Sequence, residues 1–156
     1  MSSEQIATSV LISVRPRFAD LLLDGSKTVE LRRNRTLIPP GSVGLVYSSS
    51  PQRALVGAVR FGDVRMRAPS TIWKQFGSAT GLTRREFNAY LAGVSNATAL
   101  VVEAAQSFPE PVNLAELRLR WDRFVAPQNY RYLPPAELGA ILNGEASIIR
   151  GLRRRW

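Results

Sequence analysis

Cysteine and histidine are both absent from this 156-residue chain. Without cysteine the chain has no disulfide, no thiolate nucleophile and no sulfur ligand for a metal cluster, and without histidine it lacks the commonest metal ligand and general base. These absences exclude the usual serine, cysteine and metal-dependent hydrolases. Any catalysis must therefore use Lys, Glu, Asp, Thr, Ser or Tyr, and neither a metal nor a cofactor is expected.

Lysine is scarce as well, because only Lys27 and Lys74 are lysines among the 21 basic residues and the other 19 are arginines. With 12 acidic residues the net charge is +9. Guanidinium groups bind phosphate through two parallel hydrogen bonds and stack on bases, so this composition favours a polyanionic partner. A GC-rich genome would also raise the ratio of arginine to lysine, but it would not explain the excess of basic over acidic residues.

Long apolar runs are missing, and the stretch 10–14 is too short for a signal peptide or a membrane span. We therefore expect no membrane association and a cytoplasmic location. The length and the 45% apolar content suit one folded domain over residues 1–156. Residues 143–156 form a basic C-terminal extension of that domain, and the arginines near its end are expected to be a solvated tail.

Alternation of apolar residues and turn signals predict strands at 8–14, 27–32, 43–47, 54–64, 97–105 and 128–133. Helical spacing and capping residues predict helices at 16–24, 70–76, 84–91, 114–121 and 134–142. Ser70 is expected to cap the second helix and Thr83 with Glu86 to form a capping box on the third. Pro109 with Pro111 is expected to end the strand before them. Glycines at 57 and 62 indicate bulges or close backbone approach. The fold class is therefore α+β and mostly β, a small barrel of five or six strands with a helix after the first strand and more helices before the last.

The most informative motif is Gly25-x-Lys27-x-x-Glu30-x-Arg32, which falls at a predicted helix-to-strand turn. Gly25 permits the left-handed turn that ends the helix. Glu30 and Arg32 are two residues apart in a strand, so they share a face and can hold each other or a ligand. Lys27 lies at the mouth of the strand, within reach of a phosphate or a carbonyl. Without further context, an exposed strand face with one ordinary salt bridge explains the same residues.

The stretch from Ser13 to Arg33 resembles the ASCH domain, a member of the PUA-like superfamily of small β-barrels. The turn at 39–42, the glycine-bearing strand at 54–64 and the segment 127–133 agree with it, the last being similar to a tail in a prokaryotic branch of the family. The resemblance implies a cleft between the first helix and the barrel, and a partner that is nucleic acid, most often RNA, or a nucleotide-like small molecule. It also implies that Lys27, Glu30 and Arg32 contact that ligand.

Further basic and aromatic residues are candidates for the same cleft. Arg15 and Arg17 precede the motif and Arg33 and Arg35 follow it, so all four are expected to crowd one electropositive mouth, although a solvated basic rim is the plain alternative. Most of the aromatic residues should belong to the core. Tyr47 and Tyr130 are candidates for contact with a base, and Arg131, next to Tyr130, is a further candidate for contact with the ligand.

An enzymatic alternative comes from the same resemblance. A smaller bacterial ASCH protein removes acyl groups from N4-acylated cytidine with a Lys, a Thr and a Glu, and some ASCH proteins are nucleases. The Lys matches Lys27, but the position of the Thr holds Glu30, with Thr28 nearby, and no carboxylate lies between Asp63 and Glu86 where the Glu is expected. A site that differs from the family's at these positions would use Lys27, Glu30 and Thr28 as catalytic residues. It would act either on a modified nucleoside or in metal-independent cleavage of RNA. The residues favour binding over this alternative.

Overall fold

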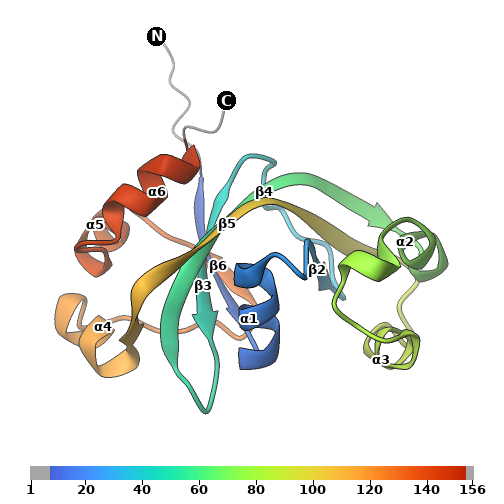
Figure 1. Cartoon of the computed structure of the whole chain (residues 1–156), viewed down its shortest axis with the longest axis horizontal. Coiled ribbons are helices and arrows are strands. Elements are labelled where there is room, and N and C mark those ends of the chain that lie inside the picture. Colours follow the sequence, from blue (N-terminus) through green and yellow to red (C-terminus); the bar gives the residue numbers. More distant parts are fainter. Residues whose placement is uncertain (1–7, 154–156) are drawn as a thin grey trace, which may run out of the picture.

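The computed structural model describes residues 8–153 and shows a six-stranded sheet with helices packed around it (Figure 1). Its elements are β1 (Ser9–Val14), α1 (Pro16–Asp24), β2 (Val29–Arg32), β3 (Val43–Ser48), β4 (Ala54–Arg67), α2 (Pro69–Phe76), a 3-10 turn (Gly77–Ala79), α3 (Arg84–Tyr90), β5 (Ala97–Asn113), α4 (Leu114–Arg120), β6 (Tyr130–Tyr132), α5 (Pro135–Ile141) and α6 (Ala146–Arg153). No helix of this described part is long and apolar enough to cross a membrane.

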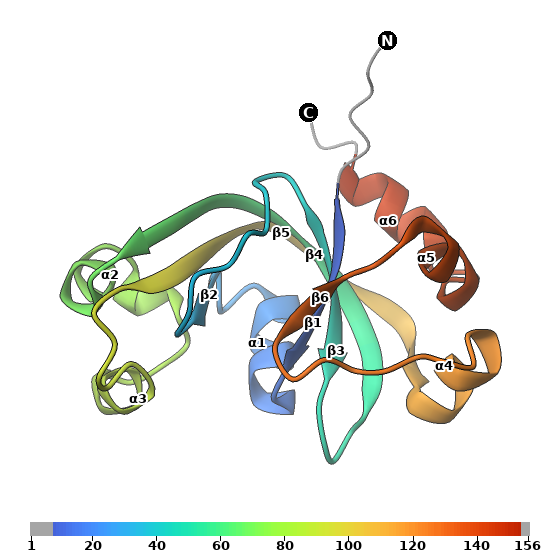
Figure 2. The same cartoon turned by 180° about the vertical axis from the view of Figure 1, so that it is seen from behind.

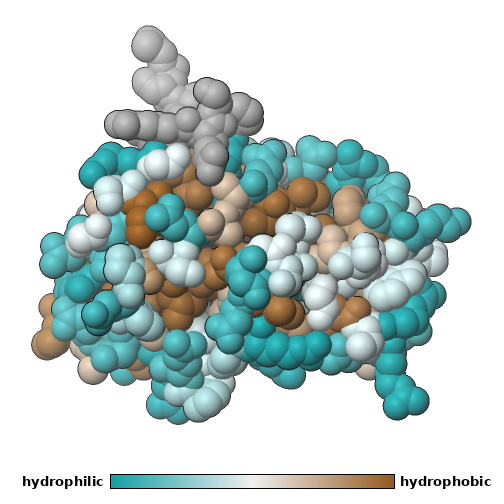
Figure 3. Space-filling model, viewed as in Figure 1, coloured by the Kyte–Doolittle hydropathy of each residue, from teal (hydrophilic) through white to brown (hydrophobic). Residues whose placement is uncertain are grey.

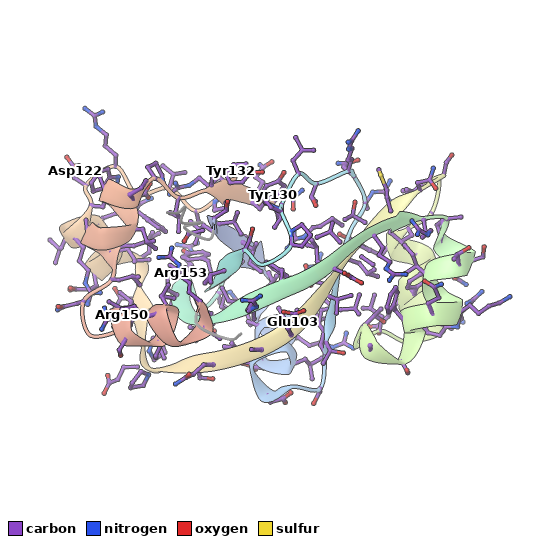
Figure 4. The ribbon with its side chains drawn as sticks, turned by 90° about the horizontal axis from the view of Figure 1, so that it is seen from above. Glu103, Asp122, Tyr130, Tyr132, Arg150 and Arg153 are labelled. Carbon is purple, nitrogen blue, oxygen red and sulfur yellow. The ribbon has the colours of Figure 1, made fainter. Side chains whose placement is uncertain are left out.

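The sheet has the strand order β2-β5-β4-β3-β1-β6, in which β1 and β3 are parallel and the other pairs are antiparallel. It curls into a half-barrel, with β2 and β6 as its two edges, so the predicted α+β, mostly β barrel is confirmed in an open form. Side chains bridge the open side: the Tyr130 hydroxyl accepts from the Leu37 amide at 3.2 Å, and the Tyr132 hydroxyl donates to the Leu37 carbonyl at 2.7 Å. Figure 4 shows both tyrosines on the β6 ribbon, beside the loop that leads into β3.

The core is divided by the curl of the sheet, because successive residues of a strand point to opposite faces. Leu11, Leu45 and Tyr47 pack with α4, α5 and α6, whereas Val10 and Ile12 pack with α1 on the other face. A third cluster joins α2 and α3 to β2 and the start of β5. On the face seen in Figure 3, hydrophilic residues form most of the outer rim and hydrophobic residues show between them.

Two glycines adopt the roles expected of them. Gly25 ends α1 in the left-handed conformation, with φ of 85°, which an L side chain rarely adopts. Gly57 lies at a shift in the β3–β4 and β4–β5 registers, where a Cβ atom would come within 2.6 Å of the Gln106 carbonyl oxygen. The bulge expected at this position is therefore confirmed, and the close approach requires glycine.

Three local predictions were wrong. Strand β4 continues beyond residue 64 to Arg67, and β5 continues through Pro109 and Pro111 to Asn113. The prolines are tolerated because the β4–β5 register jumps from Ser107 to Val112. In the described ladder the residues between these two have no partner in β4, so the amide that proline lacks is not needed there. Helix α2 begins after Ala68 with Pro69 in its first turn and no side-chain cap, so Ser70 is not its cap. The Thr83–Glu86 capping box of α3 is present as expected.

The C-terminal helices belong to the folded unit. Helix α6 buries Ile149 and Leu152 in the core with α4 and α5, and the Arg153 guanidinium donates to the Ser9 hydroxyl at 2.6 Å. The segment 143–156 that we expected to be a basic extension thus contributes this packed helix over Ala146–Arg153. Of the solvated tail expected at 153–156, Arg153 is instead partly buried and bonded to Ser9, and residues 154–156 lie outside the described residues. Figure 4 shows Arg150 and Arg153 on this helix.

Candidate functional site

A buried row of three charged side chains forms the centre of the candidate site. The turn at Gly25 reverses the chain and places Lys27 just before β2, and alternation along β2 places Glu30 and Arg32 on one face. The Glu30 carboxylate lies between the two cations, with Oε2 at 2.7 Å from Nη2 of Arg32 and Oε1 at 3.5 Å from Nζ of Lys27. All three side chains are at most 9% exposed, so the pairs are largely shielded from water.

Other partners anchor the two cations. The Lys27 ammonium donates to the Thr80 carbonyl and lies 5.1 Å from the centre of the Phe18 ring. Arg32 donates from Nη1 to Oδ1 of Asn129 at 2.6 Å and from Nη2 to the Ser13 carbonyl at 3.3 Å. Its buried Nε has no hydrogen-bond partner among the described residues. A buried donor without a partner is uncommon in folded proteins.

Burial lowers the pKa of the Lys27 ammonium below its ordinary value. The attraction of Glu30 opposes this lowering, and the positive charges of Arg32 and Arg17 add to it. The row carries two cations and one anion, so when Lys27 is protonated one positive charge is left without a carboxylate partner. The site is therefore electropositive at its buried centre and suited to an anionic group.

A cavity of about 1060 Å³ opens over this row. It extends from α3 on one side, past the start of α1, to α4 and the β3–β4 connection on the other, and Figures 1 and 2 both show α1 between these two helices. The volume is at the upper limit of ordinary ligand pockets. The lining comprises Ser13, Val14, Arg15, Arg17, Phe18, Lys27, Glu30, Leu31, Arg32, Tyr47, Ser49, Ser50, Arg53, Leu82, Glu86, Ala89, Tyr90, Leu114, Arg118, Ala126, Pro127 and Gln128.

One exposed ion pair joins α1 to α3 across the cavity. Arg17 donates from Nη1 to Oε2 of Glu86 at 2.6 Å and from Nη2 to Oε1 at 3.2 Å. The hydrogen bonds from Arg17 and from the Thr83 amide lower the pKa of Glu86 to about 2. Glu86 therefore remains an anion and a weak base at neutral pH.

The structure brings six of the predicted site residues to the cavity, namely Arg15, Arg17, Lys27, Glu30, Arg32 and Tyr47. Tyr47 is only 3% exposed, and burial raises the pKa of its hydroxyl.

The other five predicted residues are outside the lining. Thr28 lines a smaller hollow beside Val102, and Arg35 is exposed. Arg33 donates to the carbonyls of Tyr90 at 2.6 Å and Ala92 at 3.2 Å, so it holds the C-terminal end of α3. The Tyr130 hydroxyl accepts a hydrogen bond from the Leu37 amide. Arg131 forms a two-pronged pair with Glu137, with distances of 2.9 and 2.6 Å.

Four charged or tyrosine residues of the lining were not predicted as site residues: Arg53, Glu86, Tyr90 and Arg118. Glu86 was recognised only as a cap, and Arg118 lies on a helix 85 residues or more from the motif in sequence. Arg53 has φ of 51°, a left-handed conformation uncommon for a residue other than glycine, and such outliers cluster at functional sites. No sequence pattern marked these positions as part of the site, because only the curl of the sheet brings them to the cavity.

Known proteins agree with this arrangement. The family model of the ASCH domain matches residues 12–111. An "ASCH domain-containing ribonuclease" of Zymomonas mobilis is 29% identical over 128 residues, which are 81% of this chain and 85% of the relative.

Solved structures show the same fold. The crystal structure of ASCH from Zymomonas mobilis superposes with a TM-score of 0.81 at 26% identity, covering 85% of this chain and 92% of that one. The N-terminal domain of Staphylothermus marinus McrB has a TM-score of 0.57 at 11% identity, covering 88% and 94%, and shares the fold alone. With the predicted motif at the centre of its cavity and the family match over most of its length, this chain belongs to the ASCH domain family of the PUA-like superfamily.

Proposed function

We propose that this ASCH module binds RNA in the cavity, with phosphates on its arginines and the Lys27–Glu30–Arg32 row in contact with the ligand. The observation that carries the proposal is an excess of positive charge in one cavity. Six of the lining residues are cations and two are carboxylates, and both carboxylates already pair with cations in the cavity. Cations that line one cavity repel one another, and an incoming polyanion relieves that repulsion.

Three arginines of the lining are available to an anion. Arg15, Arg53 and Arg118 are exposed and form no ion pair with any residue in the described part of the chain. A phosphodiester can accept two hydrogen bonds from one guanidinium, which makes these residues suitable contacts for the backbone of RNA.

The binding experiment measures fluorescence anisotropy of a labelled RNA oligomer across a series of salt concentrations. Affinity should fall steeply as salt rises, and the double variant Arg53→Ala/Arg118→Ala should flatten the slope of log K against log salt by about 1.4, since each phosphate contact on a single strand contributes about 0.7. The matched control is Arg150→Ala, an exposed arginine on α6, away from the cavity. Salt-independent binding, or an equal effect of the control, would refute the proposal.

A second function, metal-independent RNA cleavage, is favoured by the name of the Zymomonas relative, which is a ribonuclease. In this reaction the ribose 2′ oxygen attacks the adjacent phosphorus as the bond to the 5′ oxygen breaks. A base accepts the 2′ proton and an acid returns a proton to the 5′ oxygen. We assign the base to Glu30 and the acid to Lys27, whose lowered pKa eases proton release, with Arg32 stabilising the charge that develops on phosphate.

The cleavage assay incubates RNA with the protein in excess EDTA and separates the fragments. The expected products end in a 2′,3′-cyclic phosphate, and Lys27→Met should abolish them. A substrate with a 2′-deoxyribose at the cleavage site should bind but remain intact. Cleavage that persists in Lys27→Met or on the deoxy substrate would remove this assignment, while the binding proposal would stand.

The amidohydrolase alternative is less well supported by the cavity. Its catalytic set needs a threonine, and the described lining contains none, because Thr28 lies in the other hollow. Release of cytidine from N4-acetylcytidine, with Lys27→Met as the inactive control, would reverse this ranking.

A further inference from the structure

The two ends of the cavity differ in chemistry. Of the three aromatic residues in the described lining, Phe18, Tyr47 and Tyr90, the last is the most exposed at 40%. It lies at the end of α3, with Leu82 and Ala89 also in the lining on that side. The opposite end, at α4 and the β3–β4 connection, carries the exposed Arg53 and Arg118 and the small polar residues Ser49 and Ser50.

Tyr90 is held in place at two points. The Tyr90 hydroxyl donates to the carbonyl of Leu31 on the edge strand β2 at 3.2 Å. The backbone carbonyl of Tyr90 accepts a hydrogen bond from the Arg33 guanidinium at 2.6 Å. The ring is thus fixed before any ligand arrives, which lowers the entropy lost on binding. A partly exposed, fixed aromatic ring beside cations is the usual platform for an unpaired base.

The Tyr90 ring is also anchored beside the charged row, because its hydroxyl bonds the carbonyl of Leu31, the residue between Glu30 and Arg32 in β2. Burial raises the pKa of its hydroxyl, and the nearby Arg32, Glu30 and Arg33 perturb that pKa as well. A base on this ring would therefore be close to Glu30 and Arg32, whose carboxylate and guanidinium can bond the edge of a base.

We propose, resting on the RNA-binding function above, that the α3 end of the cavity is a nucleobase subsite in which a base stacks on Tyr90. The adjoining phosphates then run toward Arg53 and Arg118 at the α4 end. A base stacked in this way is unpaired, so the ligand is a single-stranded segment that contributes at least one base and the phosphates beside it.

The experiment compares two probes, an oligoadenylate and an abasic ribose-phosphate oligomer of the same length, by anisotropy at fixed salt. Tyr90→Leu keeps apolar bulk against β2 but removes the aromatic face. It should weaken binding of oligoadenylate about 5- to 150-fold, which corresponds to about 1–3 kcal/mol per stacked base. Binding of the abasic probe should not change. Tyr90→Phe keeps the ring but loses the hydrogen bond to Leu31, so it should weaken binding of oligoadenylate less than Tyr90→Leu does.

The matched contrast is Arg53→Ala/Arg118→Ala, which should weaken both probes alike and flatten their salt dependence. If wild type binds neither probe, the proposed RNA-binding function fails. If wild type binds both but Tyr90→Leu weakens them equally, or leaves oligoadenylate unchanged, the RNA-binding function stands and the base subsite is refuted. Thermal melting of each variant shows whether a loss reflects unfolding.

Discussion

Replacing Glu30 by glutamine tests whether the buried row is held together by charge. Gln has the same shape but no charge, so Lys27 and Arg32 would remain buried without their shared anion. Removing one partner of a buried ion pair costs about 3–5 kcal/mol. Here the lower end applies, because Lys27 keeps the Thr80 carbonyl and Arg32 keeps Asn129 and the Ser13 carbonyl. A loss of about 3 kcal/mol is a large fraction of the 5–15 kcal/mol typical of a domain.

The assay is thermal and urea unfolding of Glu30→Gln against wild type at pH 7. For a domain of this size each kcal/mol moves Tm by about 2–4 °C, so the variant should melt about 6–12 °C lower. The matched control is Glu86→Gln in the exposed pair of the same cavity, which should leave Tm nearly unchanged because the solvent screens that pair.

The loss of stability in Glu30→Gln should also depend on pH. Burial already lowers the pKa of Lys27, and removing Glu30 lowers it further. Between this lowered pKa and the unfolded value of about 10.4, the unfolded chain binds more protons than the folded one, so the free energy of unfolding rises with pH. The deficit of the variant should therefore shrink as pH is raised from 7 toward 10. A Tm within a degree or so of wild type, or a deficit that grows with pH, would refute the reasoning.

Other perturbations give independent checks. Glu86→Gln should raise RNA affinity at fixed salt, since it frees Arg17 and removes a negative charge; weaker binding would contradict the placement of Arg17 in the binding surface. Because the pKa of Glu86 is about 2, wild-type affinity should show no step from this group between pH 4 and 8 in a pH titration. Thr83→Ala removes the cap of α3 and should cost about 0.5–2 kcal/mol in urea unfolding. Leu117→Ala empties a fully buried position and should cost about 2–5 kcal/mol, whereas a cost below 1 kcal/mol would mean that α4 is not packed as described.

Much of the fold could be predicted because its signals are local. The alternation in β1 and β3, the glycine that ends α1 and the capping box of α3 each act over a few residues, where backbone geometry alone decides the outcome. The errors came where a distant partner decided. Pro109 and Pro111 end a strand only if their missing amides are needed, and the jump in the β4–β5 register removes that need.

The candidate site divides in the same way. The meeting of Lys27, Glu30 and Arg32 at one turn and strand could be predicted, since their spacing and the strand period are local properties. The surroundings of these three residues depend on how distant segments pack. Arg53, Tyr90 and Arg118 come to the cavity because the sheet curls around α1, and Arg33 and Arg131 leave it because nearer acceptors hold their guanidinium groups. The strength of an ion pair depends on the distance between its two charges in the folded protein, and the spacing of residues along the chain does not give that distance.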